Sequence, residues 1–185
     1  MKLRFLVSLL TVMVLITGCS TQSSSAVKVI TYKDAAESPL IPTNYAAADY
    51  LLEQLKHNVA PNSTLIIATL VNIDALESSS TLGRLISEQI SARFTQNSYR
   101  MVELKFRNNV YIVQNQGEFM LTREIHELAK THAAQAVITG TYAQSRDFVY
   151  INLKVIQPKT NAVLAVHDYV LPLDENNRHM LRRNY

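Results

Sequence analysis

The chain has 185 residues, with 18 Lys and Arg against 15 Asp and Glu, and only four glycines. Two of the basic residues lie within the first 18 positions, and without that segment the balance is 16 against 15. A net charge near +1 gives no reason to expect a nucleic-acid partner, and so few glycines nearly exclude the Gly-rich loops of cofactor sites.

The chain opens with the pattern of a secretory signal peptide over residues 1–18. Two basic residues come first, and 13 apolar-leaning residues follow at 5–17. This stretch is shorter than the roughly 20 residues that span a bilayer, and no later apolar run reaches that length. Gly18-Cys19 resembles the bacterial lipobox. We therefore expect Cys19, the only cysteine, to be lipidated and to begin the mature protein; an incidental thiol is the alternative. By resemblance to sorted lipoproteins, Ser20 in place of Asp favours the outer membrane.

Residues 19–44 have the composition of a lipid-anchored tether. The first residues after Cys19 are small and polar, and Pro39 and Pro42 lie near the end. A flexible tether of this length has an r.m.s. reach of roughly 25–30 Å. We therefore expect one domain, residues 45–173, held close beneath the outer membrane. The 167 residues of the mature chain suffice for its hydrophobic core.

Apolar spacing predicts alternating helices and strands. The first helix is expected to have its N-cap at Thr43 or Asn44 and to end before Pro61. A continuous apolar run predicts a buried strand at 64–71. The Ser78–Thr81 cluster supplies cap candidates for a second helix, whose apolar face is Leu82, Leu85, Ile86, Ile90 and Phe94.

The second half of the domain is predicted to be mainly strands. Strands are expected at 99–106 and 110–113, a third helix at 122–133, and a meander at 136–144, 148–157 and 162–171. In the middle strand of the meander the apolar face is Val149, Ile151, Leu153 and Val155. These elements predict one α/β (α+β) domain, a mixed sheet of about five strands with about three packed helices. Residues 174–185 form a basic tail, for which a frayed terminus is expected.

Residue patterns for catalysis or metal binding are missing from the sequence. His126 and His132 are six residues apart, about 240° around a helix, so they cannot bind one metal ion as histidines four apart can. The Ser78–Thr81 cluster could bind an anion through free backbone amides, but capping is the commoner reason for such residues. Glu124 and Glu127 lack any further context for acid–base chemistry. We expect no enzyme, no cofactor and no metal.

Two surface features remain. Tyr142, Tyr150 and Tyr169 fall on successive strands of the predicted meander and could line one sheet face. Such a face is either an ordinary solvated surface or a flat subunit contact, because tyrosine combines area with a hydrogen bond. The tail from Arg178 to Tyr185 could contact an acidic neighbour or lipid headgroups, as an alternative to fraying.

Three ordered stretches, Leu70–Gln89, Val102–Lys105 and Gly117–Glu124, closely resemble the FlgO family of outer-membrane lipoproteins associated with the flagellar H ring. The resemblance extends to about Leu171. It implies a structural subunit that self-associates in a ring around the basal body, with the H-ring proteins FlgP and FlgT and the LP ring as partners. It implies neither catalytic residues nor a small-molecule substrate. The implied fold resembles the N-terminal domain of TolB, although Thr160-Asn161 stands where many such modules have glycine.

Two other functions fit the sequence less well. A periplasmic binding module that regulates a cell-envelope enzyme would be favoured by a tether long enough to cross the peptidoglycan, and this tether is short. A secretion pore resembling the curli exporter would need long amphipathic strands for a barrel, and no pair of unassigned ten-residue alternating segments is available. The structural ring subunit is therefore the leading hypothesis.

Overall fold

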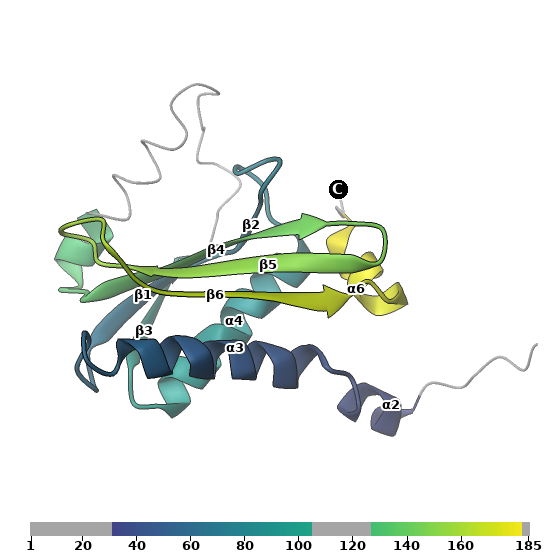
Figure 1. The fold of residues 1–185 in the computed structure, drawn as a ribbon, viewed down its shortest axis with the longest axis horizontal. Coiled ribbons are helices and arrows are strands. Elements are labelled where there is room, and N and C mark those ends of the chain that lie inside the picture. The colour runs from purple at the N-terminus through teal and green to yellow at the C-terminus, as the bar shows by residue number, and fades with distance from the viewer. Residues whose placement is uncertain (1–30, 105–126, 183–185) are drawn as a thin grey trace, which may run out of the picture. The chain divides into compact units, whose positions relative to one another are not determined.

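The computed structural model describes residues 31–104 and 127–182, drawn in colour in Figure 1. The signal peptide, Cys19, the first part of the tether and the strand expected at 110–113 lie outside the described residues. The chain divides into two compact units, Met1–Glu37 and Ser38–Tyr185. In the first unit, α2 (Tyr32–Ala36) begins with a capping box, in which the side chains of Thr31 and Asp34 each accept from the other's backbone N–H.

The second unit is built on a mixed sheet, which has six strands in the described part of the chain. The strands are β1 (Thr64–Ala68), β2 (Val71–Asn72), β3 (Arg100–Leu104), β4 (Ala136–Gln144), β5 (Phe148–Ile156) and β6 (Val163–Pro172). Their order is β3-β1-β4-β5-β6, with β2 also paired to β4. β1 runs parallel to β3 and β4, whereas β4, β5 and β6 form an antiparallel meander. This arrangement confirms the predicted mixed α/β class.

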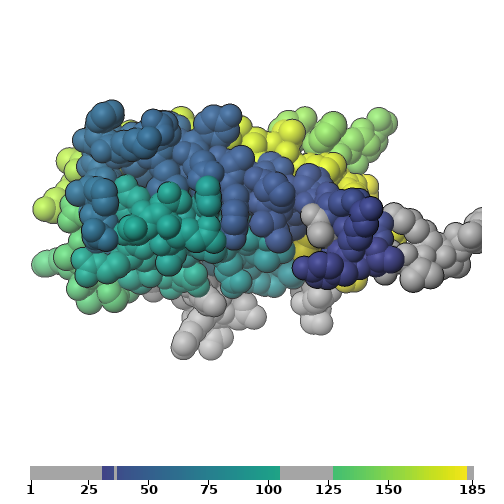
Figure 2. Space-filling view, turned by 90° about the horizontal axis from the view of Figure 1, so that it is seen from below, coloured from purple at the N-terminus to yellow at the C-terminus, as the bar shows by residue number. Residues whose placement is uncertain are grey.

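Helices α3 (Leu40–Leu55) and α4 (Thr81–Gln96) cover one face of the sheet (Figure 1). Seen from that side they lie next to each other (Figure 2). The core between helices and sheet takes its side chains from alternate strand positions. On β5 these are the four predicted residues, Val149, Ile151, Leu153 and Val155, and all four are buried. Burial of each such side chain contributes about 1.5–3 kcal/mol to folding.

The opposite face of the sheet is covered at its β3–β1 end. Residues 127–131 are helical, within the third helix predicted at 122–133. Ala129 of this segment packs with Ile66 of β1 and Val137 of β4 in a second, smaller apolar cluster. The part of the predicted helix before residue 127 lies outside the described residues.

The start of α3 differs from the prediction. The helix begins at Leu40 after Pro39 as its N-cap, so the expected cap at Thr43 or Asn44 is wrong, and residues 40–44 belong to the helix. Pro42 is the third helical residue, where the backbone N–H has no partner within the helix. Proline is therefore tolerated there, whereas deeper in the helix it would break it. Leu40 and Asn44 are both buried against the domain.

The strand expected at 64–71 is divided in two. β1 ends at Ala68, and β2 starts at Val71. Between them, serines of the α4 region bond the backbone of Leu70: its N–H donates to Ser87 Oγ at 2.9 Å, and its carbonyl accepts from Ser79 Oγ at 2.6 Å. The backbone of Leu70 is thus satisfied by side chains instead of a neighbouring strand.

The tail is ordered up to Arg182, contrary to the expected frayed terminus. α6 (Glu175–Leu181) has Asp174 as its N-cap, whose side chain accepts from the Asn177 N–H at 2.7 Å. Asn177 is buried and donates from Nδ2 to the carbonyl of Pro172 at 2.8 Å. Met180 and Leu181 pack against the main core. A capped first turn and apolar side chains near the end hold this helix to the domain.

Candidate functional site

The serines at 78–80 organise the loop before α4. Ser80 is the N-cap, and its Oγ accepts from the Gly83 N–H at 3.1 Å. Ser79 donates to Leu70, and Ser78 donates to the carbonyl of Ala75 at 3.0 Å. All three hydroxyls are therefore engaged within the fold. Capping explains Ser80, and hydrogen bonds to loop carbonyls explain Ser78 and Ser79.

The histidine and glutamate pairs are only partly described. His126 and Glu124 lie outside the described residues, whereas Glu127 and His132 are exposed near the short helix 127–131. Over residues 31–104 and 127–182, no group of three or more His, Cys, Asp or Glu is placed to hold a metal ion. In the same two ranges, no helix has the length and apolar character needed to cross a membrane.

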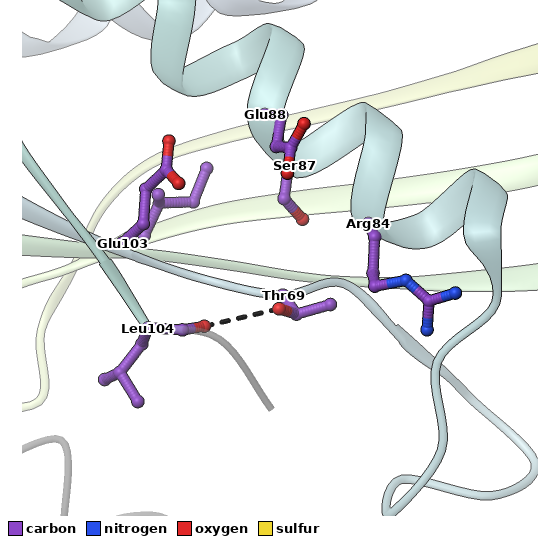
Figure 3. A pocket seen from close by; sticks show the side chains of 7 residues that line it. Thr69, Arg84, Ser87, Glu88, Glu103 and Leu104 are labelled. Atoms are coloured by element: carbon purple, nitrogen blue, oxygen red, sulfur yellow. Dashed lines mark hydrogen bonds between the residues drawn. The ribbon is translucent and has the colours of Figure 1, made fainter. Parts of the chain in front are cut away.

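A hollow lies between α4 and the carboxyl ends of β1 and β3 (Figure 3). Arg84, Ser87 and Glu88 of α4 line one side, and Glu103 and Leu104 of β3 line the other. Its volume is about 150 Å³, below the roughly 300–1,000 Å³ of typical small-molecule sites. The buried Ser87 hydroxyl already donates to the carbonyl of Gly83 at 3.0 Å. The hollow is too small for a drug-sized ligand.

The three tyrosines of the meander do not share one face, so that prediction is wrong. Tyr142 pairs with Ile151 and Tyr169 also pairs with Ile151, so both face the helices. Tyr150 pairs with Ala143 and Val170, on the other side of the sheet. Accordingly Tyr142 is 5% exposed and Tyr150 is 53% exposed.

Tyr169 belongs to a polar network that the sequence did not reveal. Its hydroxyl donates to Asn44 Oδ1 at 2.6 Å, and Asn44 Nδ2 donates to Gln89 Oε1 at 2.6 Å. The network joins β6, α3 and α4, and Asn44 is fully buried at its centre. Burial raises the pKa of Tyr169. Beside it the His167 ring stacks on Tyr50 of α3, with centroids 4.6 Å apart. These contacts fix how α3 lies on the sheet.

Helices α3 and α4 cover only one face of the meander β4–β5–β6, and they leave its other face uncovered. We call it the open face, made up of the outward positions of the three strands: Thr139, Thr141 and Ala143 of β4, Phe148, Tyr150, Asn152, Lys154 and Ile156 of β5, and Val163, Val166, Asp168, Val170 and Pro172 of β6. Several of its large apolar side chains are exposed, namely Phe148, Tyr150, Val163, Val166 and Val170. Such a patch is typical of a protein contact.

Side chains block the free edge of β6 at two positions, Val166 and Pro172. The Gln54 amide of α3 donates to the carbonyl of Val166 at 2.9 Å and accepts from its N–H at 3.2 Å, as a neighbouring strand would. Further along, Pro172 has no N–H to offer, and its carbonyl is taken by Asn177. Blocked edges of this kind protect a sheet against the addition of another strand.

The fold thus defines a small α/β domain with a polar network inside and an apolar open face outside. The sequence profile of the FlgO protein family matches residues 45–176. The chain therefore belongs to the FlgO family, as the resemblance predicted. This membership associates it with flagellum-related lipoproteins of the cell envelope. A search of characterised proteins found no significant sequence match.

Solved structures that align with part of this chain include several of low sequence identity. The LpoB C-terminal domain from Escherichia coli has 8% identity and a TM-score of 0.48, covering 69% of this chain and 97% of that one. The corresponding domain from Salmonella enterica has 11% identity and a TM-score of 0.46, covering 68% and 94%. The PelC dodecamer from Paraburkholderia phytofirmans has 10% identity and a TM-score of 0.38, covering 60% and 72%. These likenesses concern the fold alone.

Proposed function

We propose that the chain is a non-enzymatic, lipid-anchored subunit of the flagellar H ring at the periplasmic face of the outer membrane. The observation that carries the proposal is the match of residues 45–176 to the FlgO family. The partners that follow from it are other copies of the chain, the H-ring proteins FlgP and FlgT, and the neighbouring LP ring. Its role is to support assembly of the flagellum and motility.

Acylated Cys19 is the proposed anchor. Two or three acyl chains hold a protein stably in a membrane, since each buried methylene contributes about 0.8 kcal/mol. The residue after Cys19 is Ser20, which favours release to the outer membrane. Cys19 and the first residue of α3 are 21 positions apart, a distance of at most about 75 Å for a fully extended chain. Because α3 starts at Leu40, this connection is shorter than the sequence indicated, which supports a position near the membrane.

The described surface supports a binding role more than a catalytic one. The serine cap of α4 and the Asn44 network serve the interior of the domain, and Gln54 blocks the β6 edge at Val166. The hollow under α4 is small. The open face carries exposed apolar side chains and an open hollow of about 550 Å³, lined among others by Tyr150, Asn152 and Val170. Exposed apolar patches of this kind are typical of protein contacts, whereas small substrates are usually bound in enclosed pockets.

The test compares two variants of the anchor in a strain that lacks the chromosomal copy. Cys19→Ser removes the acylated residue, and Ser20→Asp keeps it but favours retention at the inner membrane. Wild-type protein should fractionate with the outer membrane and restore swimming, whereas both variants should leave that fraction and fail to restore it. Full swimming of the deletion strain would contradict the proposal. Normal swimming combined with altered cell-wall synthesis would favour the alternative, a regulator of an envelope enzyme.

A further inference from the structure

We propose that the open face binds the open face of a second copy of this chain. A solvated face of an antiparallel sheet normally carries polar side chains. Here Phe148 and Tyr150 of β5 are 45% and 53% exposed, and Val166 and Val170 of β6 are 47% and 45% exposed. Large β-branched and aromatic side chains on neighbouring strands form a surface suited to packing against another sheet.

The charges of the open face indicate a second copy as the partner. Among its described residues only two are charged, Lys154 on β5 and Asp168 on β6. They lie on adjacent strands two residues out of register, because Lys154 pairs with Val166 and Asn152 pairs with Asp168. Asn152 Nδ2 donates to the Asp168 carboxylate and holds it in place. A face with one charge of each sign complements itself, since a two-fold axis can bring each Lys154 near the Asp168 of the other copy.

The blocked edge of β6 favours contact through the face over extension of the sheet. Gln54 occupies the N–H and carbonyl of Val166, and Asn177 occupies the carbonyl of Pro172. A second copy that added a strand along β6 would have to displace these side chains. Contact through the open face displaces neither of them.

The size of the open face predicts a weak contact. Three strands about 4.8 Å apart and nine residues long at about 3.3 Å per residue cover roughly 400 Å². Stable interfaces bury about 800 Å² per partner, so the pair should dissociate at ordinary concentrations in solution. Anchoring both copies in one membrane raises their effective concentration without any new contact. The contact is therefore to be sought on the membrane.

This pairing goes beyond the proposed role in the ring, but its detection in cells rests on the proposed lipid anchor. A two-fold contact closes on itself, so it joins copies in pairs and cannot alone close a ring. A ring would then be assembled from pairs through a second surface. If the open faces do not pair, the proposed role in the ring is unaffected. If the chain is not part of the ring, the open faces can still pair.

Cysteine cross-linking of the full chain in cells tests the pairing. Tyr150→Cys places a thiol on the open face, and Tyr50→Cys places one on α3 at similar exposure, 53% against 59%. Val170→Cys, opposite Tyr150 on β6, provides a second open-face position. Two copies with tags of different length are co-expressed and treated with a bis-maleimide reagent, with the wild-type chain reporting any reaction of Cys19. We expect mixed-tag dimers at least five-fold more abundant from the open-face positions than from Tyr50→Cys.

Exchanging the charges at Lys154 and Asp168 then tests whether two open faces attract each other through these residues. The exchanges are made in the Tyr150→Cys variant. Lys154→Asp places like charges on both faces and should reduce the cross-linked dimer at least five-fold. Adding Asp168→Lys to the same chain reverses both signs and should restore it. Protein level and outer-membrane fractionation report whether each variant folds. Equal cross-linking at Tyr50 and Tyr150, cross-linking only to a protein of another mass, or no rescue by the double exchange would overturn the inference.

Discussion

Replacing Gly83 by alanine has two opposite effects on the stability of the domain. It raises the helix propensity of the first turn of α4, and it crowds the packing of that turn against the sheet. An added Cβ would lie 2.7 Å from Tyr142 Cε1 and 2.8 Å from both the Leu70 carbonyl oxygen and Ser79 Oγ. The Leu70 carbonyl is main chain and already bonded to Ser79, so it cannot rotate away. Accommodating the methyl group therefore requires α4 to move away from the sheet.

The two effects can be given magnitudes. Alanine is favoured over glycine within a helix by about 1 kcal/mol, whereas overpacking costs about 1–3 kcal/mol. Three contacts below 3 Å, one of them with main chain, place the packing cost in the upper part of that range. We therefore expect Gly83→Ala to lower the free energy of unfolding by about 1–2 kcal/mol.

Urea unfolding of the mature chain without its acyl groups measures this change. Ala92→Gly in the same helix is the matched control, because it reports the local difference in propensity between alanine and glycine. Its expected loss is about 1 kcal/mol. If Gly83→Ala proved as stable as the wild type or more stable, the close approach of α4 to β4 would be refuted.

Three further predictions concern the interior and the sheet edge. Asn44→Ala leaves the Tyr169 hydroxyl without its acceptor and should cost about 1–3 kcal/mol in urea unfolding, and the cost should shrink in a Tyr169→Phe background; additive losses would contradict the network. Burial raises the pKa of Tyr169, because the folded state disfavours its ionised form. The contribution of Tyr169 to the free energy of unfolding is therefore complete at pH values below its ordinary pKa of 10.0 and is lost as the pH rises above that value. Urea midpoints compared below and above pH 10.0 should fall less for Tyr169→Phe than for the wild type, and an equal fall would refute this. Gln54→Ala, which opens the Val166 edge, should increase self-association in sedimentation experiments, and unchanged sedimentation would show that this amide does not protect the edge.

The fold class and the meander could be predicted because the strands there carry their own signal. Burial of alternate residues on β5 follows directly from the alternation of the sequence, and β4 has the predicted limits of Ala136–Gln144. Asn161 adopts φ of 57°, a left-handed conformation that asparagine tolerates in the last hairpin. The same alternation places Tyr150 on the other face of the sheet from Val149 and Ile151, so the orientation of this tyrosine could be predicted from the sequence.

Other features depend on contacts that the sequence does not display. The break between β1 and β2 is set by serines of the α4 region that bond Leu70. The polar network requires Asn44 and Tyr169, which are 125 positions apart, to meet inside the fold. The early start of α3 was hidden because Pro42 resembles a helix breaker when its position in the first turn is unknown. For α6, by contrast, Asp174 was a visible cap signal that the basic charge of the tail obscured.

The central claim, that this FlgO-family chain is a subunit of the flagellar H ring, is tested most directly by electron cryotomography of flagellar bases in a strain lacking the chain. The account predicts that density of the outer ring is missing or incomplete in the averaged basal body. It further predicts that wild-type protein restores the ring and that Cys19→Ser does not. An intact outer ring in the deletion strain would contradict the claim.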